Sequence, residues 1–193
     1  MPLILASASA IRRTMLEQAG VGFAVSPAAV DEHTEKALHE DPASLAEALA
    51  VAKAVAGSGE HPEDWVIGSD SVASAGGRRF DKPASRDEAA EHLRFFSGKV
   101  LQLTSAVALA RDGACPWTHT DTARLDVRQL SDRFIEDYLD TEWPEIGYCA
   151  GAFRLEGLGV QLFERIEGSY FTILGMPLLP LLGALRERQL IAS

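Results

Sequence analysis

The sequence predicts a mixed α/β (α+β) fold, in which helices flank a central, partly antiparallel β-sheet and two lobes surround a cleft. Helical patterns alternate with short strand-like runs along the chain. Two pairs of these runs are separated by turn residues typical of hairpins, Gly-Gly at 76–77 and Arg-Asp-Gly at 111–113. Hairpins pair strands antiparallel, which excludes a doubly wound parallel sheet. We expect the 193 residues to form a single domain, 1–193.

The first element is a strand that leads through a tight turn into a helix. Residues 3–6 form an apolar run, Ser7 and Ser9 lie in the turn, and a helical pattern follows. Arg12 and Arg13 fall in the first helical turn, where unpaired N–H groups and the helix dipole disfavour cations. Hydroxyl side chains beside these cations indicate a bound anion. Phosphate is the usual anion at such a place, and we expect Arg12 to bind it. The alternative is a helix capped by Ser9 with solvated arginines, which we favour for Arg13.

The other elements follow from apolar periodicity, caps and turn residues. Strands are expected at 22–26, 65–68, 100–110 and 117–127 and, after a turn, within 157–167. Helices are expected at 43–56, 87–96, 131–140 and about 177–189, with Asp41 and Ser131 as caps and Gly57 ending the first helix. The acidic pair Asp31-Glu32 is placed in a loop, and the strand at 65–68 is expected to stop before Ser-Asp-Ser.

The charge balance limits the classes of partner. The chain has 28 acidic and 18 basic residues, a formal net charge of -10, which argues against a nucleic-acid polymer bound on a broad basic surface. It does not exclude a single nucleotide held by a few cations and a divalent metal ion. The glycine-rich phosphate loops GxxxxGKS/T and GxGxxG are absent from the sequence. Phosphate would therefore be held by side chains.

Cysteine usage and hydropathy indicate a cytoplasmic protein. Cys115 and Cys149 lie far apart without a CxxC motif or a histidine-rich neighbourhood, so we expect reduced thiols rather than a zinc site or a disulfide framework. Residues 1–10 lack the basic leader of a signal peptide. The longest apolar run, 176–185, is far below the roughly 20 residues that a membrane span needs. No membrane contact is expected.

Four further side chains could carry chemistry. Asp70 follows an apolar strand, where a strand end opens onto a crevice in α/β folds, and could bind a divalent cation or act as a general base. Ser-Asp-Ser is also an ordinary turn composition. Lys53 continues the apolar stripe of its helix, so its ammonium either points into a cleft or snorkels into solvent. Lys82 precedes a proline, and Glu156 precedes a glycine turn. Each could belong to a binding site or to an ordinary loop.

Several motifs follow one another along the chain. They are LASASAIRR, VDE, AVAKA, VIGSDSV, DKP, FFSGKVLQLTSAVAL, CAGAFRLEGLG and IEGSYFTILGMPL. In this order, from about Leu3 to Leu179, the chain resembles the Maf family of nucleoside triphosphate pyrophosphatases. The resemblance implies a Maf/ITPase-like fold. It also implies hydrolysis of a nucleoside triphosphate between the α and β phosphates, with Mg²⁺, Mn²⁺ or Co²⁺ as the divalent metal.

The resemblance implies a role for each matching residue. Asp70 matches the catalytic proton acceptor, and Glu32 and Asp70 match the metal-associated acids. Phosphate-facing and other substrate-binding positions are Ser7, Arg12, Lys53, Lys82 and, on the side of the base, Glu156. Three cations face a triphosphate with close to four negative charges, and the two carboxylates add two more, so a divalent ion would be needed to restore the balance.

The positions that select the base depart from the family pattern. The resemblance implies Ile11, Ser71 and Glu156 as specificity positions. Ile11 is neither the arginine of the UTP/dTTP branch nor the tryptophan of the 7-methyl-GTP branch, and Ala10 replaces a common proline. Glu156 and its surroundings are closer to the 7-methyl-GTP branch, since a carboxylate accepts two donors from a guanine-like edge. Ile11 offers no aromatic ring to a methylated, cationic base, so purines and pyrimidines both stay possible.

Three functions follow as hypotheses. The first is a metal-dependent nucleotide pyrophosphatase that removes non-standard or surplus nucleotides. The second is a nucleotide-binding regulator of septum formation and cell division, and the third is a phosphatase of small phosphoesters. A carboxylate base such as Asp70 among phosphate-binding cations favours turnover over binding alone. The resemblance also makes a homodimer possible.

Overall fold

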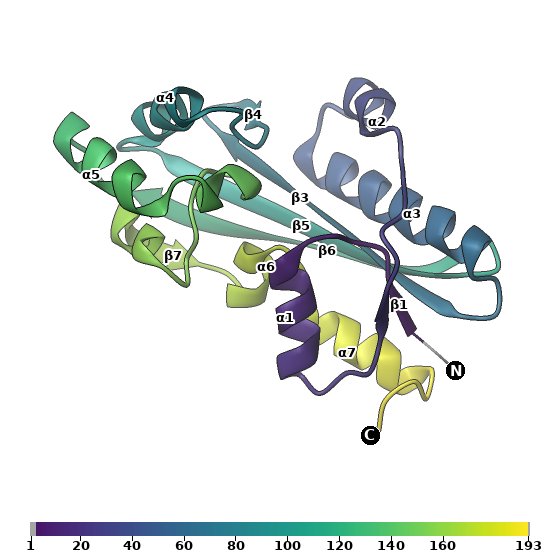
Figure 1. Cartoon of the computed structure of the whole chain (residues 1–193). Helices are drawn as coiled ribbons and strands as arrows, with labels where there is room; N and C mark the ends of the chain where they lie inside the picture. Colours follow the sequence, from purple (N-terminus) through teal and green to yellow (C-terminus); the bar gives the residue numbers. More distant parts are fainter. Residues whose placement is uncertain (1–2, 193) are drawn as a thin grey trace.

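A computed structural model describes residues 3–192 and shows a long mixed β-sheet with helices on both faces (Figure 1). The strand order is β2-β1-β3-β5-β6-β7, and β4 pairs with β3 beside this path. β1 is parallel to β2 and β3, whereas the other pairs are antiparallel, which confirms the predicted mixed sheet. The strands are β1 (Leu3–Leu5), β2 (Ala24–Val25), β3 (Trp65–Ala75), β4 (Arg78–Phe80), β5 (Val100–Arg111), β6 (Ala114–Val127) and β7 (Phe163–Glu167).

Two hairpins form where the turn residues predict them. Gly76 and Gly77 join β3 to β4 with φ angles of 56° and 76°, and Asp112 and Gly113 join β5 to β6 with φ angles of 49° and 73°. A left-handed conformation at both central residues matches the twist of the paired strands, and glycine adopts it without a steric penalty. Both hairpins are antiparallel, as expected.

The helices begin at the expected caps. Asp41 accepts the N–H of Ser44 at 2.8 Å, and Ser131 accepts the N–H of Phe134 at 3.2 Å. Within residues 3–192, no helix combines the length and the apolar character that crossing a bilayer requires. The helices are α1 (Ala10–Gln18), α2 (Glu32–Leu38), α3 (Pro42–Glu60), α4 (Arg86–Phe96), α5 (Asp132–Glu142), α6 (Tyr170–Leu174) and α7 (Leu178–Glu187), with the 3-10 turns η1 (Glu145–Tyr148) and η2 (Leu158–Leu162).

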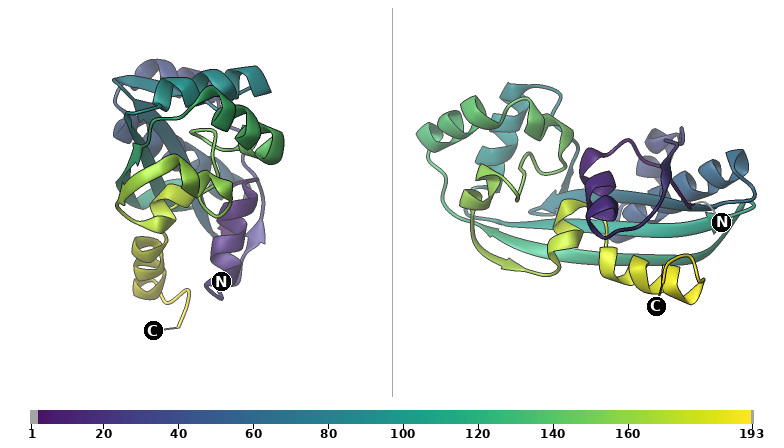
Figure 2. Two further views of the ribbon diagram at one scale, coloured as in Figure 1. Left: turned by 90° about the vertical axis from the view of Figure 1, so that its left-hand side faces the viewer. Right: turned by 60° about the horizontal axis from the view of Figure 1, so that its bottom comes forward.

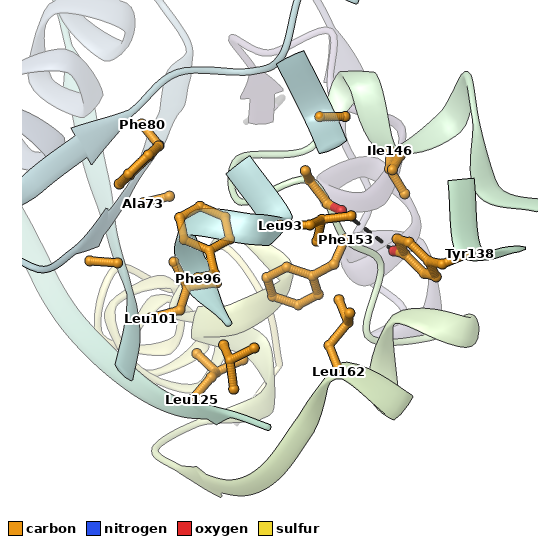
Figure 3. Close-up of a cluster of buried hydrophobic side chains, with 14 of the residues drawn as sticks. Ala73, Phe80, Leu93, Phe96, Leu101, Leu125, Tyr138, Ile146, Phe153 and Leu162 are labelled. Carbon is orange, nitrogen blue, oxygen red and sulfur yellow. Dashed lines mark hydrogen bonds between the residues drawn. The ribbon is translucent and has the colours of Figure 1, made fainter. Parts of the chain in front are cut away.

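Buried side chains gather at the two ends of the long strands, in keeping with two lobes. At one end α4 and α5 cover the sheet around Leu93, Phe96 and Leu125 (Figure 3). At the other end α1 and α7 pack on the same face around Leu16 and Leu181. Figure 2 shows these two groups of helices apart from each other, joined by β3, β5 and β6. The middle of the long strands therefore lies between the two groups.

α3 covers the opposite face of the sheet and packs very close to β3. A Cβ atom at Gly68 would lie 2.1 Å from the carbonyl oxygen of Ala50 and 2.5 Å from the nitrogen of Ala54. Only glycine allows this approach, and the alanines of α3 keep the helix side of the contact small. Lys53 lies on the face of α3 that packs against the sheet, so the close packing places Lys53 next to β3.

β3 is longer than the sequence predicts. The strand does not stop at residue 68 but continues to Ala75. Its pairing with β5 runs without interruption from Val66 opposite Ala110 to Ala75 opposite Leu101. Strand pairing thus overrides the turn-like composition of Ser-Asp-Ser. Asp70 lies in the middle of a strand, and its expected place at a strand end is wrong.

Two helix boundaries also differ from the expectation. α2 starts at Glu32, where a loop was expected, because the Asp31 carboxylate accepts two backbone N–H groups at 3.1 and 3.2 Å and caps the helix. α3 does not end at Gly57 but continues to Glu60. Gly57 serves packing instead, since a Cβ there would lie 2.9 Å from a methyl carbon of Val66. The short helix α6, which precedes α7, was not predicted from the sequence.

Candidate active site

The candidate site lies beside a gap in the pairing of β3. On one edge of β3, β1 pairs with residues 65–67 and β4 pairs with residues 73–75. Between these two stretches, no strand of the described residues covers that edge, whereas β5 covers the other edge along almost its whole length. β1 ends at Leu5, and the chain turns there into α1. The opening expected next to Asp70 therefore results from the end of β1 and not from the end of β3.

Arg12 reaches from α1 to β3 at this gap. Its Nε donates a hydrogen bond to the carbonyl oxygen of Gly175 at 2.9 Å. Its terminal nitrogens donate to the hydroxyl oxygens of Ser7, at 3.3 Å, and Ser71, at 3.1 Å. All three acceptors are neutral. A guanidinium held in this way keeps its charge available for an anion.

A buried polar network supports Arg12 from behind. The carbonyl oxygen of Gly175 also accepts from Ser69 Oγ at 3.0 Å and from Ser71 Oγ at 3.1 Å. Ser71 Oγ lies 2.8 Å from Ser105 Oγ, and Ser105 Oγ donates to the carbonyl oxygen of Thr172 at 2.8 Å. No motif signal links segments so far apart in the chain, so the sequence does not single out Ser69, Ser105, Thr172 and Gly175. Ser71, a predicted specificity position, contacts this network on the side of Arg12.

A compact charged cluster lies on the face of β3 that α3 covers. Lys53 Nζ is 2.6 Å from Asp70 Oδ1 and 2.7 Å from Glu32 Oε1. The Lys53 side chain is only 13% exposed, so it points to the site and does not snorkel into solvent. Asp70 pairs with Ala106 in register, on the face packed by α3, and α2 supplies Glu32 at its first position. The fold thus brings together three residues from three elements.

The charges of this cluster act on Arg12 as well. Burial lowers the pKa of Arg12, while the negative charges of Asp70 and Glu32 raise it. Arginine has so high an intrinsic pKa that Arg12 stays charged at neutral pH. Burial on its own would raise the pKa of Glu32, but the hydrogen bond and charge of Lys53, together with the charges of Lys36 and Lys82, outweigh it and the pKa is lowered. Glu32 is therefore held as a carboxylate near three cations.

Lys82 and Glu156 lie at the edge of the same region. Lys82 lies just after β4, and Glu156 lies in the turn before η2. Both side chains are exposed, and neither forms an ion pair in the described part of the chain. The pKa of Cys149 is raised to about 11, mainly by burial and also by the charge of Glu156, against the opposing charges of Arg154 and Lys82. The charges of Glu156 and Lys82 are thus close enough to act on one half-buried thiol. Ile11, the third position on the side of the base, is half-buried in the first turn of α1.

Glu142, which was not predicted from the sequence, anchors the turn that carries Glu156. Glu142 is 4% exposed and accepts two hydrogen bonds from the guanidinium of Arg154, at 2.9 and 2.8 Å. Its other oxygen accepts the N–H of Leu158 at 3.0 Å. These bonds hold both ends of the turn. Because Arg154 is engaged by Glu142, the Glu156 carboxylate is left for another partner.

Two expectations outside the site are confirmed. Arg13 is exposed and pairs with Glu17 on the same helix at 2.7 Å, so it plays no part in the cluster around Arg12. Cys115 and Cys149 are both free thiols.

Glu32 and Asp70 fit a divalent metal ion that arrives with a phosphate ligand. Among the residues that the structure describes, no three histidine, cysteine or acidic side chains gather into a metal-binding group, which does not fit a zinc-type site. Mg²⁺ usually binds one or two carboxylates and completes its shell with phosphate oxygens and water. Two carboxylates that converge on the ammonium of Lys53 match this donor set.

Known proteins resemble this chain over nearly its full length. Residues 2–188 match the family model described as Maf-like protein. The 7-methyl-GTP pyrophosphatase of Rhizobium etli is 49% identical, over 96% of this chain and 95% of that protein. The nucleoside triphosphate pyrophosphatase of Paramagnetospirillum magneticum is 47% identical, over 95% of this chain and 97% of that protein. The 7-methyl-GTP pyrophosphatase of Rhizobium meliloti is also 49% identical, over 96% of this chain and 95% of that protein.

Proposed function

Since the chain belongs to the Maf-like protein family, we propose that it hydrolyses nucleoside triphosphates to a nucleoside monophosphate and pyrophosphate. The observation that carries the proposal is the convergence of Arg12, Lys53, Glu32 and Asp70 beside the gap in β3 pairing. Cations at such a place bind phosphate groups. A carboxylate that can accept a proton supports turnover rather than binding alone.

Asp70 is the proposed general base. It would accept a proton from a water molecule whose oxygen attacks the α phosphorus, while the bond from that phosphorus to the bridging oxygen breaks and pyrophosphate leaves. Phosphoryl transfer depends mainly on positioning and on neutralising charge. Lys53 supports this role, because its 2.6 Å bond to Asp70 Oδ1 fixes the position of the carboxylate.

A divalent cation, Mg²⁺, Mn²⁺ or Co²⁺, belongs to the proposal. When bound by Glu32 and Asp70 it would supply positive charge to the phosphate oxygens. Arg12, Lys53 and Lys82 offer three positive charges, which the two carboxylates largely cancel, so the chain alone does not balance a triphosphate. We expect no activity in the presence of a chelator.

We further propose a house-cleaning role towards modified or surplus nucleotides, with 7-methyl-GTP as the first substrate to test. Two relatives at 49% identity are named for that substrate. Glu156 supports a guanine-like base, because its carboxylate is exposed and Arg154, its neighbour, is engaged by Glu142. Ile11 provides no aromatic ring to stack on a cationic base, so specificity for the base would depend on its contacts with Glu156. A cytoplasmic location and a homodimer stay predictions.

The test is a product assay on the purified protein. Canonical triphosphates and 7-methyl-GTP are incubated with Mn²⁺, and pyrophosphate and orthophosphate are measured separately. We expect pyrophosphate and a monophosphate. Orthophosphate alone would contradict cleavage between the α and β phosphates and favour a phosphatase. Nucleotide binding without either product would favour the regulator of cell division.

Asp70→Asn tests the assigned base in the same assay. The amide keeps the shape of the side chain but cannot accept the proton, so kcat should fall by at least ~100-fold. Glu17→Gln, which alters only an exposed ion pair, is the matched control and should keep its activity. Unchanged turnover in Asp70→Asn would remove Asp70 from the mechanism.

A further inference from the structure

A second group of basic side chains lines a cavity outside the candidate active site. The cavity has a volume of about 390 Å³ and lies between the β3–β4 turn and the start of α3. Its lining contains three arginines and one carboxylate, and therefore an excess of positive charge in a chain whose net charge is -10. The residues that matter here are Arg78, Arg79, Arg124, Ser74, Gln102 and Glu40.

The floor of the cavity is a row of polar residues on one face of the sheet. Ser74 of β3 lies opposite Gln102 of β5, which lies opposite Arg124 of β6. Side chains opposite one another in neighbouring strands point to the same face. α3 covers this face further along but begins only at Pro42, which itself lines the cavity. The row is thus left open to a ligand.

Seven of the fourteen arginines in this acidic chain form an ion pair with a carboxylate in the part of the chain that the structure describes. Ion pairs are formed by Arg13, Arg86, Arg94, Arg133, Arg154, Arg165 and Arg188. Within residues 3–192, the three arginines of the cavity form none. Carboxylates outnumber cations in the sequence, so three unpaired arginines around one hollow are not explained by a shortage of acids. An anion from outside the chain would explain them.

Two of the three cavity arginines are placed by contacts other than ion pairs. Arg79 donates to two backbone carbonyl oxygens near the end of α2, and Arg78 lies over the ring of Phe95 at 4.8 Å. Arg124 lies opposite Glu167 in the sheet, but that carboxylate bonds to Arg165 instead. Neutral contacts thus fix Arg78 and Arg79 without neutralising their charge, and the carboxylate opposite Arg124 is engaged elsewhere.

We propose that this cavity is a second anion site, which binds a small molecule carrying two or more phosphate charges. Its volume lies within the usual range of small-molecule sites. Ser74 is four residues beyond Asp70 on β3, about 13 Å along the strand. Val72 lies between them on the same face and is buried against α3, so apolar packing separates the cavity from the candidate active site. The inference does not depend on the proposed pyrophosphatase activity.

The test follows the backbone amides of Gly76 and Gly77 by NMR while inorganic pyrophosphate is added in the presence of a chelator. These two residues line the cavity and are exposed, so they report on it locally, and the chelator keeps the pyrophosphate free of divalent ions. We expect a saturable shift in the wild type. Arg124→Gln should weaken binding by about tenfold, as expected for losing one charge-assisted hydrogen bond.

Arg186→Gln is the matched control, because Arg186 is exposed, lies outside the cavity and changes the net charge by the same amount. It should leave the affinity unchanged, while Arg78→Gln provides a second variant with the expected loss. A parallel titration with a nucleoside monophosphate assigns the source: tighter binding of pyrophosphate indicates an inorganic ligand, and the reverse indicates a nucleotide.

Two outcomes would overturn the proposal. One is the absence of a saturable shift at millimolar pyrophosphate, or equal affinity in the wild type, Arg124→Gln and Arg78→Gln. The other is a shift of Gly76 and Gly77 that depends on protein concentration and not on phosphate, which would mean that a second copy of the chain covers this surface.

Discussion

Replacing Gly68 with alanine should push α3 away from β3. The new Cβ atom would lie 2.1 Å from the carbonyl oxygen of Ala50 and 2.5 Å from the nitrogen of Ala54, where ordinary contacts begin at 3.4 Å. Both are backbone atoms that cannot rotate away, so the helix must move by roughly 1 Å and the free energy of unfolding should fall by about 3 kcal/mol, the upper part of the usual range for overpacking. Lys53 moves with α3, so its 2.6 Å contact with Asp70 should lengthen and kcat should fall.

Urea denaturation of Gly68→Ala and of Gly59→Ala provides the comparison. Gly59 lies on the same helix, and a Cβ there meets nothing within 4 Å. That substitution should stabilise the protein by up to about 1 kcal/mol, because alanine favours helix and restricts the unfolded chain. The two glycine-to-alanine changes should therefore have opposite signs. Equal stability of the two variants, or full activity in Gly68→Ala, would refute the argument that close packing positions Lys53.

Three further predictions follow from contacts in and around the site. Ser105→Ala removes the hydroxyl that lies 2.8 Å from Ser71 Oγ beneath the guanidinium, so KM for the triphosphate should rise by roughly 3- to 10-fold with a smaller change in kcat; an unchanged KM contradicts it. Glu142→Gln should lower the free energy of unfolding by about 2 kcal/mol in urea, whereas the exposed Glu17→Gln should stay within about 0.5 kcal/mol; equal losses would contradict the anchoring role. The folded-state pKa of Glu32 is lowered from 4.5, so its contribution to stability is present above pH 4.5 and is lost as the pH falls through the lowered value. Urea melts should therefore show a shallower acid decline for Glu32→Gln than for the wild type, and parallel declines would oppose this assignment.

Local signals predicted much of the fold. The hairpin turns and the caps Asp41 and Ser131 depend on residues within a few positions of one another, and the structure confirms them. The mixed sheet followed from the hairpins. The end of β3 could not be predicted in this way, because its residues 69–75 are held as a strand by pairing with β5, about thirty positions away in sequence. Local composition at Ser-Asp-Ser pointed to a turn.

The candidate site also contains residues that local sequence signals predict and residues that they do not. Lys53 could be singled out because a lysine on an apolar helical stripe departs from a local pattern, and Arg12 because it lies in a first helical turn. Ser105, Thr172 and Gly175 could not, because their importance comes only from contacts made after folding. Small polar residues in strands and helix ends have no distinctive pattern of their own.

Arg12 and Arg154 show how the fold distributes charge. Arg154 receives a carboxylate, Glu142, and together they stabilise a turn. Arg12 is held by neutral oxygens alone, although Asp70 lies close enough to influence its pKa, because Lys53 binds that carboxylate at 2.6 Å. Taking a guanidinium out of water without a bonded anion is unfavourable, so a phosphate group that binds there relieves a cost already present in the free protein. In the proposed function, Lys53 would thus favour phosphate at Arg12, because it engages the Asp70 carboxylate that would otherwise act more strongly on the guanidinium.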